Sequence, residues 1–253
     1  MTADPNFRKR PHSTRADVFL VAHGYAASRT EARRAIEARK VRVDGVELAK
    51  PSAPVPEGAE VIYSPAHAYV SRGALKLAAA LDGFRLSPVD AICLDLGAST
   101  GGFTQLLLQR GAARVYAVDV GHGQLHPSLR GDARVIPIER CNVRALSREL
   151  IAEPADAIVA DVSFISLKLA LPPALKLARN GAWLVALVKP QFEVGRANIG
   201  KGGIVRDAAA RELAVSGMAQ WLSAFGWKIA GTMESPVPGG SGNIEFLLAA
   251  RNK

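Results

Sequence analysis

The chain has 253 residues, 49% of them hydrophobic, which suffices for one large and one small domain and excludes a wholly disordered protein. Its formal net charge of +9 indicates a polyanionic partner. Nucleic acid is favoured over a membrane, because no segment reaches the roughly 18 consecutive apolar residues of a membrane span. Cys93 and Cys141 show no zinc or redox spacing, the histidines are scattered, and no signal peptide is evident. We expect a cytoplasmic protein without a bound metal.

The N-terminal quarter is the most basic part of the chain. Residues 8–42 contain ten lysines and arginines against three acidic residues. A basic tail is expected over residues 1–13 and a compact unit over residues 14–62. Prolines then mark a linker over residues 63–70, and a larger domain is expected over residues 71–253.

Two local signals predict the structure of the small unit. Ser28-Arg29-Thr30-Glu31 has the pattern of a capping box, so a helix should begin near Arg29. Asp44-Gly45 stands between alternating valines and predicts a hairpin. The charges on this unit can either solvate it or bind RNA, and their number favours binding as a group.

Short β-rich runs alternate with amphipathic stretches in the larger part. The β-rich runs cover residues 91–97, 114–120, 134–139, 156–162, 183–189, 227–235 and 244–250. Strands that alternate with helices predict an α/β fold with a parallel, doubly wound sheet. The last two runs are joined by a turn-rich segment, so the final strand should run antiparallel. Ligands bind such sheets at the carboxyl ends of the strands.

The first strand of this sheet ends in a glycine-rich turn, "LDLGASTGGFT". Asp95 is followed by Gly97, Gly101 and Gly102, which allow close approach of a ligand to the backbone and to the amides of a helix start. Asp119 ends the second strand, where a carboxylate can bind two ribose hydroxyls. The spacing suits an adenosine cofactor of either the nicotinamide or the S-adenosylmethionine type.

Two further positions bear on the identity of the cofactor. Ser99 and Thr100 precede the glycine pair, so the turn departs from G-x-G-x-x-G, which a pyrophosphate needs more than a sulfonium does. This departure favours S-adenosylmethionine. Asn142 follows the third strand, where its amide can meet the adenine edge or cap a helix.

Four charged residues are expected at the ligand-binding edge. Asp161 ends the fourth strand and Lys189 ends the fifth, while Lys76 lies on the helix entering the domain and Glu245 opens the last strand. A single pair of this kind is usually a structural ion pair. Two lysines and two carboxylates together can instead provide a general base for a weakly acidic hydroxyl.

The loop over residues 191–207 follows Lys189 and carries Arg196, Lys201 and Arg206. Its glycines and positive charge predict a mobile basic lid over RNA. The alternative is an ordinary surface loop.

The motifs "SRGALK", "DLGASTGGFT", "ADVSFIS", "LVKPQFE" and "GNIEF" together resemble the FtsJ-type ribose 2′-O-methyltransferases. That family has a Lys-Asp-Lys-Glu tetrad, which falls here on Lys76, Asp161, Lys189 and Glu245. The resemblance implies a Rossmann-like class I methyltransferase domain with a doubly wound seven-stranded sheet. It also implies S-adenosylmethionine as cofactor, held by Asp95, Gly97, Ser99, Gly101, Gly102, Asp119, Asn142 and Asp161.

About fifty N-terminal residues resemble the small α+β RNA-binding domain named for ribosomal protein S4. With this domain in front, nearly the whole chain is similar to the TlyA family, which methylates cytidine ribose in ribosomal RNA and is sometimes labelled hemolysin. The resemblance implies ribosomal RNA or ribosomal subunits as partner. The candidate RNA contacts are Arg15, Arg29, Arg33, Arg34, Lys40, Arg42, Arg72, Arg196 and Lys201.

The implied mechanism assigns a role to each member of the tetrad. Lys189 deprotonates or polarises the ribose 2′-hydroxyl, which attacks the sulfonium methyl, and Asp161 orients Lys189. Lys76 holds the oxygen or a phosphate, and Glu245 positions Lys76 or the ribose. The alternatives are a non-catalytic RNA-binding factor, a membrane-active hemolysin and, less favoured by the glycine spacing, a nicotinamide oxidoreductase.

Overall fold

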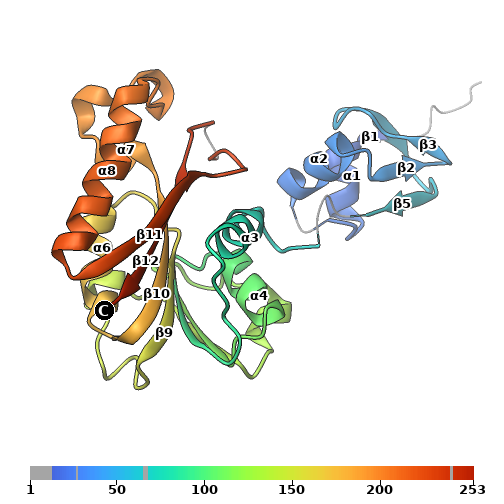
Figure 1. Ribbon diagram of the computed structural model, residues 1–253. Helices are drawn as coiled ribbons and strands as arrows, with labels where there is room; N and C mark the ends of the chain where they lie inside the picture. Colours follow the sequence, from blue (N-terminus) through green and yellow to red (C-terminus); the bar gives the residue numbers. More distant parts are fainter. Residues whose placement is uncertain (1–12, 27, 65–67, 240–241) are drawn as a thin grey trace, which may run out of the picture. The chain divides into compact units, whose positions relative to one another are not determined.

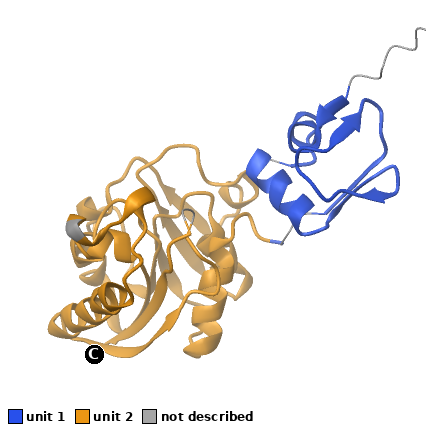
Figure 2. Ribbon diagram, turned by 90° about the horizontal axis from the view of Figure 1, so that it is seen from above, with its two compact units in different colours: residues 1–68 blue, residues 69–253 orange. Residues whose placement is uncertain are grey.

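The computed structural model describes residues 13–26, 28–64, 68–239 and 242–253. The chain divides into two compact units, residues 1–68 and 69–253, which Figure 2 shows in different colours. Most of the predicted basic tail, residues 1–12, lies outside the described residues, and so do residues 65–67 of the predicted linker.

The first unit packs two helices against two small antiparallel sheets (Figure 1). Its helices are α1 (Ala16–Ala22) and α2 (Arg29–Glu37). Strand β1 (Ser13–Arg15) pairs with β4 (Pro54–Pro56), and the order β3-β2-β5 joins Val46–Glu47, Val41–Val43 and Val61–Tyr63. The core contains Phe19, Leu20, Ile36, Val41 and Val55, so the unit buries its own apolar residues.

The two local signals in this unit are confirmed. The hydroxyl of Ser28 accepts a hydrogen bond from the amide of Glu31 at 3.2 Å, and α2 begins at Arg29. Asp44 and Gly45 join β2 to β3 with positive φ angles of 49° and 78°, which a tight two-residue hairpin turn requires.

The second unit contains a seven-stranded sheet in the order β11-β12-β10-β9-β6-β7-β8. Pairing is parallel from β10 to β8 and antiparallel where β12 meets β10 and β11, as the sequence predicts. The strands are β6 (Ile92–Leu96), β7 (Arg114–Val118), β8 (Val135–Ile138), β9 (Ala155–Ala160), β10 (Ala178–Val188), β11 (Trp227–Glu234) and β12 (Phe246–Asn252). The predicted doubly wound α/β sheet is confirmed.

Helices cover both faces of this sheet (Figure 1). One face packs against α3 (Gly73–Gly83), α4 (Gly102–Gln109) and α5 (Pro127–Arg130), and the other against α6 (Leu167–Leu175) and α8 (Ala208–Ala224). Short α7 (Pro190–Glu193) and three 3₁₀ turns, η1 (Val143–Ala145), η2 (Arg196–Asn198) and η3 (Lys201–Gly203), complete the unit. Ile158 of β9 packs on one face while Val159 packs on the other, because side chains alternate along a strand.

Candidate active site at the carboxyl edge of the sheet

Strand register brings the four tetrad residues to one edge of the sheet. Val188 lies opposite Phe246 in the antiparallel pair of β10 and β12, so Lys189 and Glu245 adjoin the same end of that pair. Asp161 directly follows β9, which runs parallel to β10, and so reaches the same edge. Lys76 extends from α3, which contacts β12. Residues far apart in the chain thereby meet.

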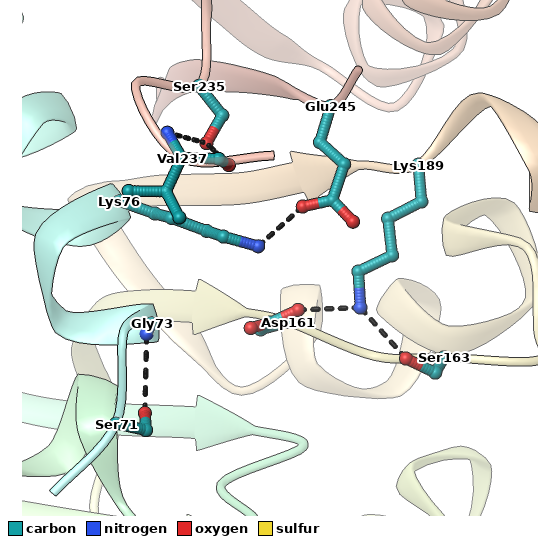
Figure 3. A network of polar contacts seen from close by, with 9 residues as sticks. All are labelled: Ser71, Gly73, Lys76, Asp161, Ser163, Lys189, Ser235, Val237 and Glu245. Carbon is teal, nitrogen blue, oxygen red and sulfur yellow. Dashed lines mark hydrogen bonds and ion pairs between the residues drawn. The ribbon is translucent and has the colours of Figure 1, made fainter. Parts of the chain in front are cut away.

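The tetrad forms two ion pairs, drawn in Figure 3. Lys76 Nζ lies 2.5 Å from Glu245 Oε2, and Lys189 Nζ lies 2.7 Å from Asp161 Oδ1. Both lysines are 8% exposed and Glu245 is 3% exposed. Charges buried to this degree must be paired, and each lysine has its own carboxylate.

The segment Lys189–Glu193 ties the end of β10 to the neighbouring helix α6. Lys189 is the N-cap of α7, and Pro190 takes the first helical position, where its missing N–H leaves no bond unmade. Glu193 then accepts hydrogen bonds from the amide of Leu167 at 2.8 Å and the hydroxyl of Ser166 at 2.6 Å. Burial raises the pKa of Glu193. This anchor holds the backbone of Lys189 in place.

The glycine turn after β6 is shaped by close approach to β9. Gly97 has a φ of +82°, and a Cβ atom there would lie 2.7 Å from the carbonyl oxygen of Asp161. Gly101 has a φ of +95° and is the N-cap of α4, and a Cβ atom there would collide with the side chains of Leu125 and Leu129. Only glycine meets these conditions. The turn therefore passes directly beside the tetrad.

Asp119 and Asn142 organise the next two strand ends. Asp119 accepts hydrogen bonds from the amide of Ser99 at 2.8 Å and from that of Gly121 at 2.7 Å, which links the first two turns. Asn142 is the N-cap of η1 and accepts from the amide of Arg144 at 3.0 Å. The helix-cap interpretation of Asn142 is thus confirmed.

These strand ends border a cavity of about 660 Å³, a volume ordinary for a small-molecule site. Five of the eight predicted cofactor residues line it, namely Gly97, Ser99, Asp119, Asn142 and Asp161. Asn142 is therefore both a helix cap and a wall of the cavity. The cavity and the ion pair of Lys189 share Asp161.

Asp95 lies in the core below the glycine turn, with an exposed fraction of 0%. Its Oδ2 accepts a hydrogen bond from the hydroxyl of Thr104 at 2.6 Å, while its Oδ1 is buried without a hydrogen-bond partner. Burial raises the pKa of Asp95 to about 7, and Thr104 opposes that shift. An unpaired buried carboxylate oxygen is costly, which marks Asp95 as a candidate for a functional role.

Two residues of the site were not singled out from the sequence. Ser163 Oγ accepts a hydrogen bond from Lys189 Nζ at 2.8 Å. Phe164 is 91% exposed, has a φ of +64° and contacts Phe192 with ring centroids 5.4 Å apart. Both line the cavity. The signal was present in "ADVSFIS", where a hydroxyl and an aromatic ring follow directly on a strand-end aspartate.

The predicted RNA-binding residues have different surroundings. Arg15 and Arg29 both form ion pairs with the buried carboxylate of Asp17, at 3.0 and 2.8 Å, while their own side chains stay more than half exposed. Arg33, Lys40, Arg42, Arg196 and Lys201 are exposed, and Arg34 and Arg72 are partly buried. Asp17 therefore holds two of the predicted RNA contacts in fixed positions.

Asn243, which lies just before the last strand β12, attaches the loop over residues 191–207 to the segment that leads into that strand. This residue is 3% exposed, accepts from the amide of Val205 at 3.0 Å and donates to the carbonyl of Gly203 at 2.9 Å. Asn243 stands two residues before Glu245. The loop is thus fixed close to the tetrad at its far end, and its predicted role as a lid stays a prediction.

Comparison with known proteins assigns both units to families. Residues 69–252 match the FtsJ-like methyltransferase family, and residues 14–61 match the S4 domain. The chain belongs to the FtsJ-like methyltransferase family. It is also 47% identical over 241 residues to a Mycobacterium tuberculosis protein named 16S/23S rRNA (cytidine-2'-O)-methyltransferase TlyA, covering 94% of this chain and 90% of that one. The predicted resemblance to the TlyA family is confirmed.

Two further relatives carry the name hemolysin. Hemolysin A of Brachyspira hyodysenteriae is 40% identical over 92% of this chain and 98% of its own. A solved structure from Streptococcus thermophilus, described as a hemolysin, superposes with a TM-score of 0.76 at 41% identity, covering 97% of this chain and 90% of that chain. In the described part of this FtsJ-like chain, no helix combines the length and apolar character needed to cross a bilayer.

Proposed function

We propose that this protein is an S-adenosylmethionine-dependent methyltransferase that modifies the ribose 2′-hydroxyl of a cytidine in ribosomal RNA. The proposal rests on two ion pairs, Lys76 with Glu245 and Lys189 with Asp161. They lie beside a cavity that is lined in part by the glycine turn. Membership of the FtsJ-like family and the name of the Mycobacterium tuberculosis relative support it. A cytoplasmic location belongs to the same proposal.

The residues around the cavity fit S-adenosylmethionine. Gly97 leaves the backbone open where a side chain would collide with the carbonyl of Asp161, and Asp119 presents a carboxylate at the second strand end. Asp95 keeps one buried oxygen unpaired directly below the turn and is not among the residues that line the cavity. When bound, the cofactor supplies a methyl group already activated by its sulfonium centre. Asn142, at the cavity wall, is assigned to the adenine edge.

Lys189 is assigned the contact with the reacting hydroxyl. Its amine accepts or polarises the proton of the 2′-hydroxyl, which increases the nucleophilicity of that oxygen. Asp161 holds Lys189 Nζ at 2.7 Å and so fixes where the amine lies. Since the methyl group is already activated, we expect most of the acceleration to come from this positioning.

Lys76 and Glu245 form the second ion pair of the site. Lys76 is assigned to the acceptor oxygen or a neighbouring phosphate, because its ammonium is a compact cation with three donors. Glu245 keeps Lys76 in place with a contact of 2.5 Å and is therefore a positioning residue.

RNA recognition is assigned to both units. Residues 14–62 are proposed to contact folded RNA through their arginines and lysines, which orient a protein on phosphates without reading sequence. Residues 71–253 are proposed to carry out the transfer, with Arg72, Arg196 and Lys201 as further contacts. Phe164, exposed at the cavity, offers an aromatic face on which a base can stack.

The proposal is tested by methyl transfer from tritiated S-adenosylmethionine to unmethylated small and large ribosomal subunits. We expect label in RNA that resists alkaline cleavage at the modified nucleotide, and loss of label in Lys189→Ala. Lys228→Ala changes an exposed lysine on β11; it is the matched control and should retain activity. Cofactor binding without incorporation into either subunit would contradict the assigned substrate.

A further inference from the structure

Lys189 has a second acceptor besides its carboxylate. Ser163 Oγ lies 2.8 Å from Lys189 Nζ, and Asp161 Oδ1 lies 2.7 Å from the same nitrogen (Figure 3). Both acceptors belong to the segment that directly follows β9, two residues apart. Asp161 alone already neutralises the charge of the lysine. The serine contact therefore needs a different explanation.

The geometry of an ammonium group supplies that explanation. A lysine ammonium has three N–H bonds in a tetrahedral arrangement, and when a single acceptor holds it the end of the side chain can still swing about that one contact. Two acceptors on different atoms prevent this movement, so the third position of Lys189 Nζ has one direction. Asp161 and Ser163 also line the cavity, so this direction is fixed relative to the cavity wall.

A purely structural role explains the contact poorly. Ser163 is exposed and its hydrogen bond to Lys189 is only partly buried, so a water molecule can replace the hydroxyl at little cost to folding. A hydroxyl differs from a carboxylate because it can accept from an ammonium and donate to a neutral amine. Ser163 can therefore keep its contact with Lys189 in either protonation state, while Asp161 can only accept.

We propose that Ser163 is a positioning residue that, with Asp161, sets the orientation of the Lys189 amine toward the substrate hydroxyl. The inference rests on the proposed function, since it assigns a direction to the group that contacts the 2′-hydroxyl. Ser163 acts through Lys189, and its loss should affect the rate of transfer more than the binding of either substrate.

The first test measures single-turnover methyl transfer at saturating RNA and cofactor. Ser163→Ala should lower the rate about tenfold, the loss expected for one hydrogen bond to a charged group, with both dissociation constants unchanged within about twofold. Ser163→Thr keeps the hydroxyl and should recover most of the rate. An unchanged rate in Ser163→Ala, or an equal loss in both variants, would overturn the inference.

The second test needs neither RNA nor cofactor. Reductive methylation with labelled formaldehyde, read by mass spectrometry, compares Lys189 with Lys76 in the same sample. Removing the hydroxyl should raise the Lys189-to-Lys76 labelling ratio severalfold, because an amine held by one acceptor fewer leaves its ion pair more often and becomes accessible to formaldehyde. Ser163→Thr should match the native ratio.

The two tests separate the inference from the proposed function. If the native chain transfers no methyl group to any RNA, the proposed function fails, and the labelling ratio alone decides whether Ser163 holds Lys189. An unchanged ratio in Ser163→Ala overturns the contact itself. A changed ratio with an unchanged transfer rate overturns its role in the reaction.

Discussion

Variants of the ion pair between Lys76 and Glu245 should affect the stability and the activity of this protein differently. In Glu245→Leu, the ammonium of Lys76 stays buried without its 2.5 Å partner. Removing one member of a buried pair costs about 3 to 5 kcal/mol, because the remaining charge is desolvated and uncompensated. Since Lys76 is 8% exposed and Glu245 is 3% exposed, we expect a loss in this range.

The double variant Lys76→Met/Glu245→Leu removes both charges and leaves apolar side chains of similar size. A buried pair replaced in this way is close to neutral for stability, so the double variant should recover to within about 1 kcal/mol of the native chain. Its methyl transfer should nevertheless be lost. The pair would then be present for chemistry and not for folding.

Urea unfolding followed by tryptophan fluorescence measures this effect in the relevant unit. The three tryptophans, Trp183, Trp221 and Trp227, all lie in residues 69–253, so the signal reports on the methyltransferase unit. The matched control is Lys228→Met, an exposed lysine on β11. A double variant as unstable as Glu245→Leu would refute the reasoning, because the loss would then come from packing and not from an unpaired charge.

Three further predictions follow from the strand ends and from the first unit. Gly97→Ala should weaken cofactor binding and stability together, measured by calorimetry and urea unfolding, since its Cβ would lie 2.7 Å from a carbonyl oxygen. Burial raises the pKa of Asp95 to about 7, so the folded state keeps a proton that the unfolded state loses above about pH 4. The free energy of unfolding of the native chain should therefore fall as the pH rises from 4 to 7, and this fall should exceed that of Asp95→Asn by at most about 4 kcal/mol. Parallel pH curves for the two proteins would contradict this. The hydrogen bond from Arg15 lowers the pKa of Asp17 to about 2, so its contribution is present above about pH 4 and lost as the pH falls toward 2. Asp17→Asn should lower the free energy of unfolding of the first unit by about 1 kcal/mol at pH 7. Amide hydrogen exchange in α1 and α2 as a function of urea measures this loss, and equal protection of these amides in the two proteins would refute the role of Asp17.

Much of the architecture could be read from the order of residues because the signals are local. Alternation of apolar strands and amphipathic helices predicted the doubly wound sheet, and the turn-rich segment before the last strand predicted its antiparallel direction. Ser28 and Asp44-Gly45 marked a helix start and a hairpin, since caps and tight turns depend on a few adjacent residues.

The approach of Asp161 and Lys189 could be predicted, because residues that end parallel strands meet at one edge of the sheet, whereas the resemblance to the FtsJ-type tetrad pointed to Lys76 and Glu245. The pairing within it was decided by tertiary structure. Register sets Val188 opposite Phe246, and this places Lys189 and Glu245 at the same end of their strands. The side chains then pair Lys189 with Asp161 and Lys76 with Glu245, a choice that depends on three-dimensional distances.

Residue order alone determined that two lysines and two carboxylates stand at strand or helix ends beside a glycine-rich turn. Only the folded chain decided that Ser163 is the second acceptor of Lys189 and that Asp95 keeps an unpaired buried oxygen. Both depend on how a side chain is solvated and on which groups surround it. These properties arise from contacts between segments distant in the chain, so a local pattern of residues does not specify them.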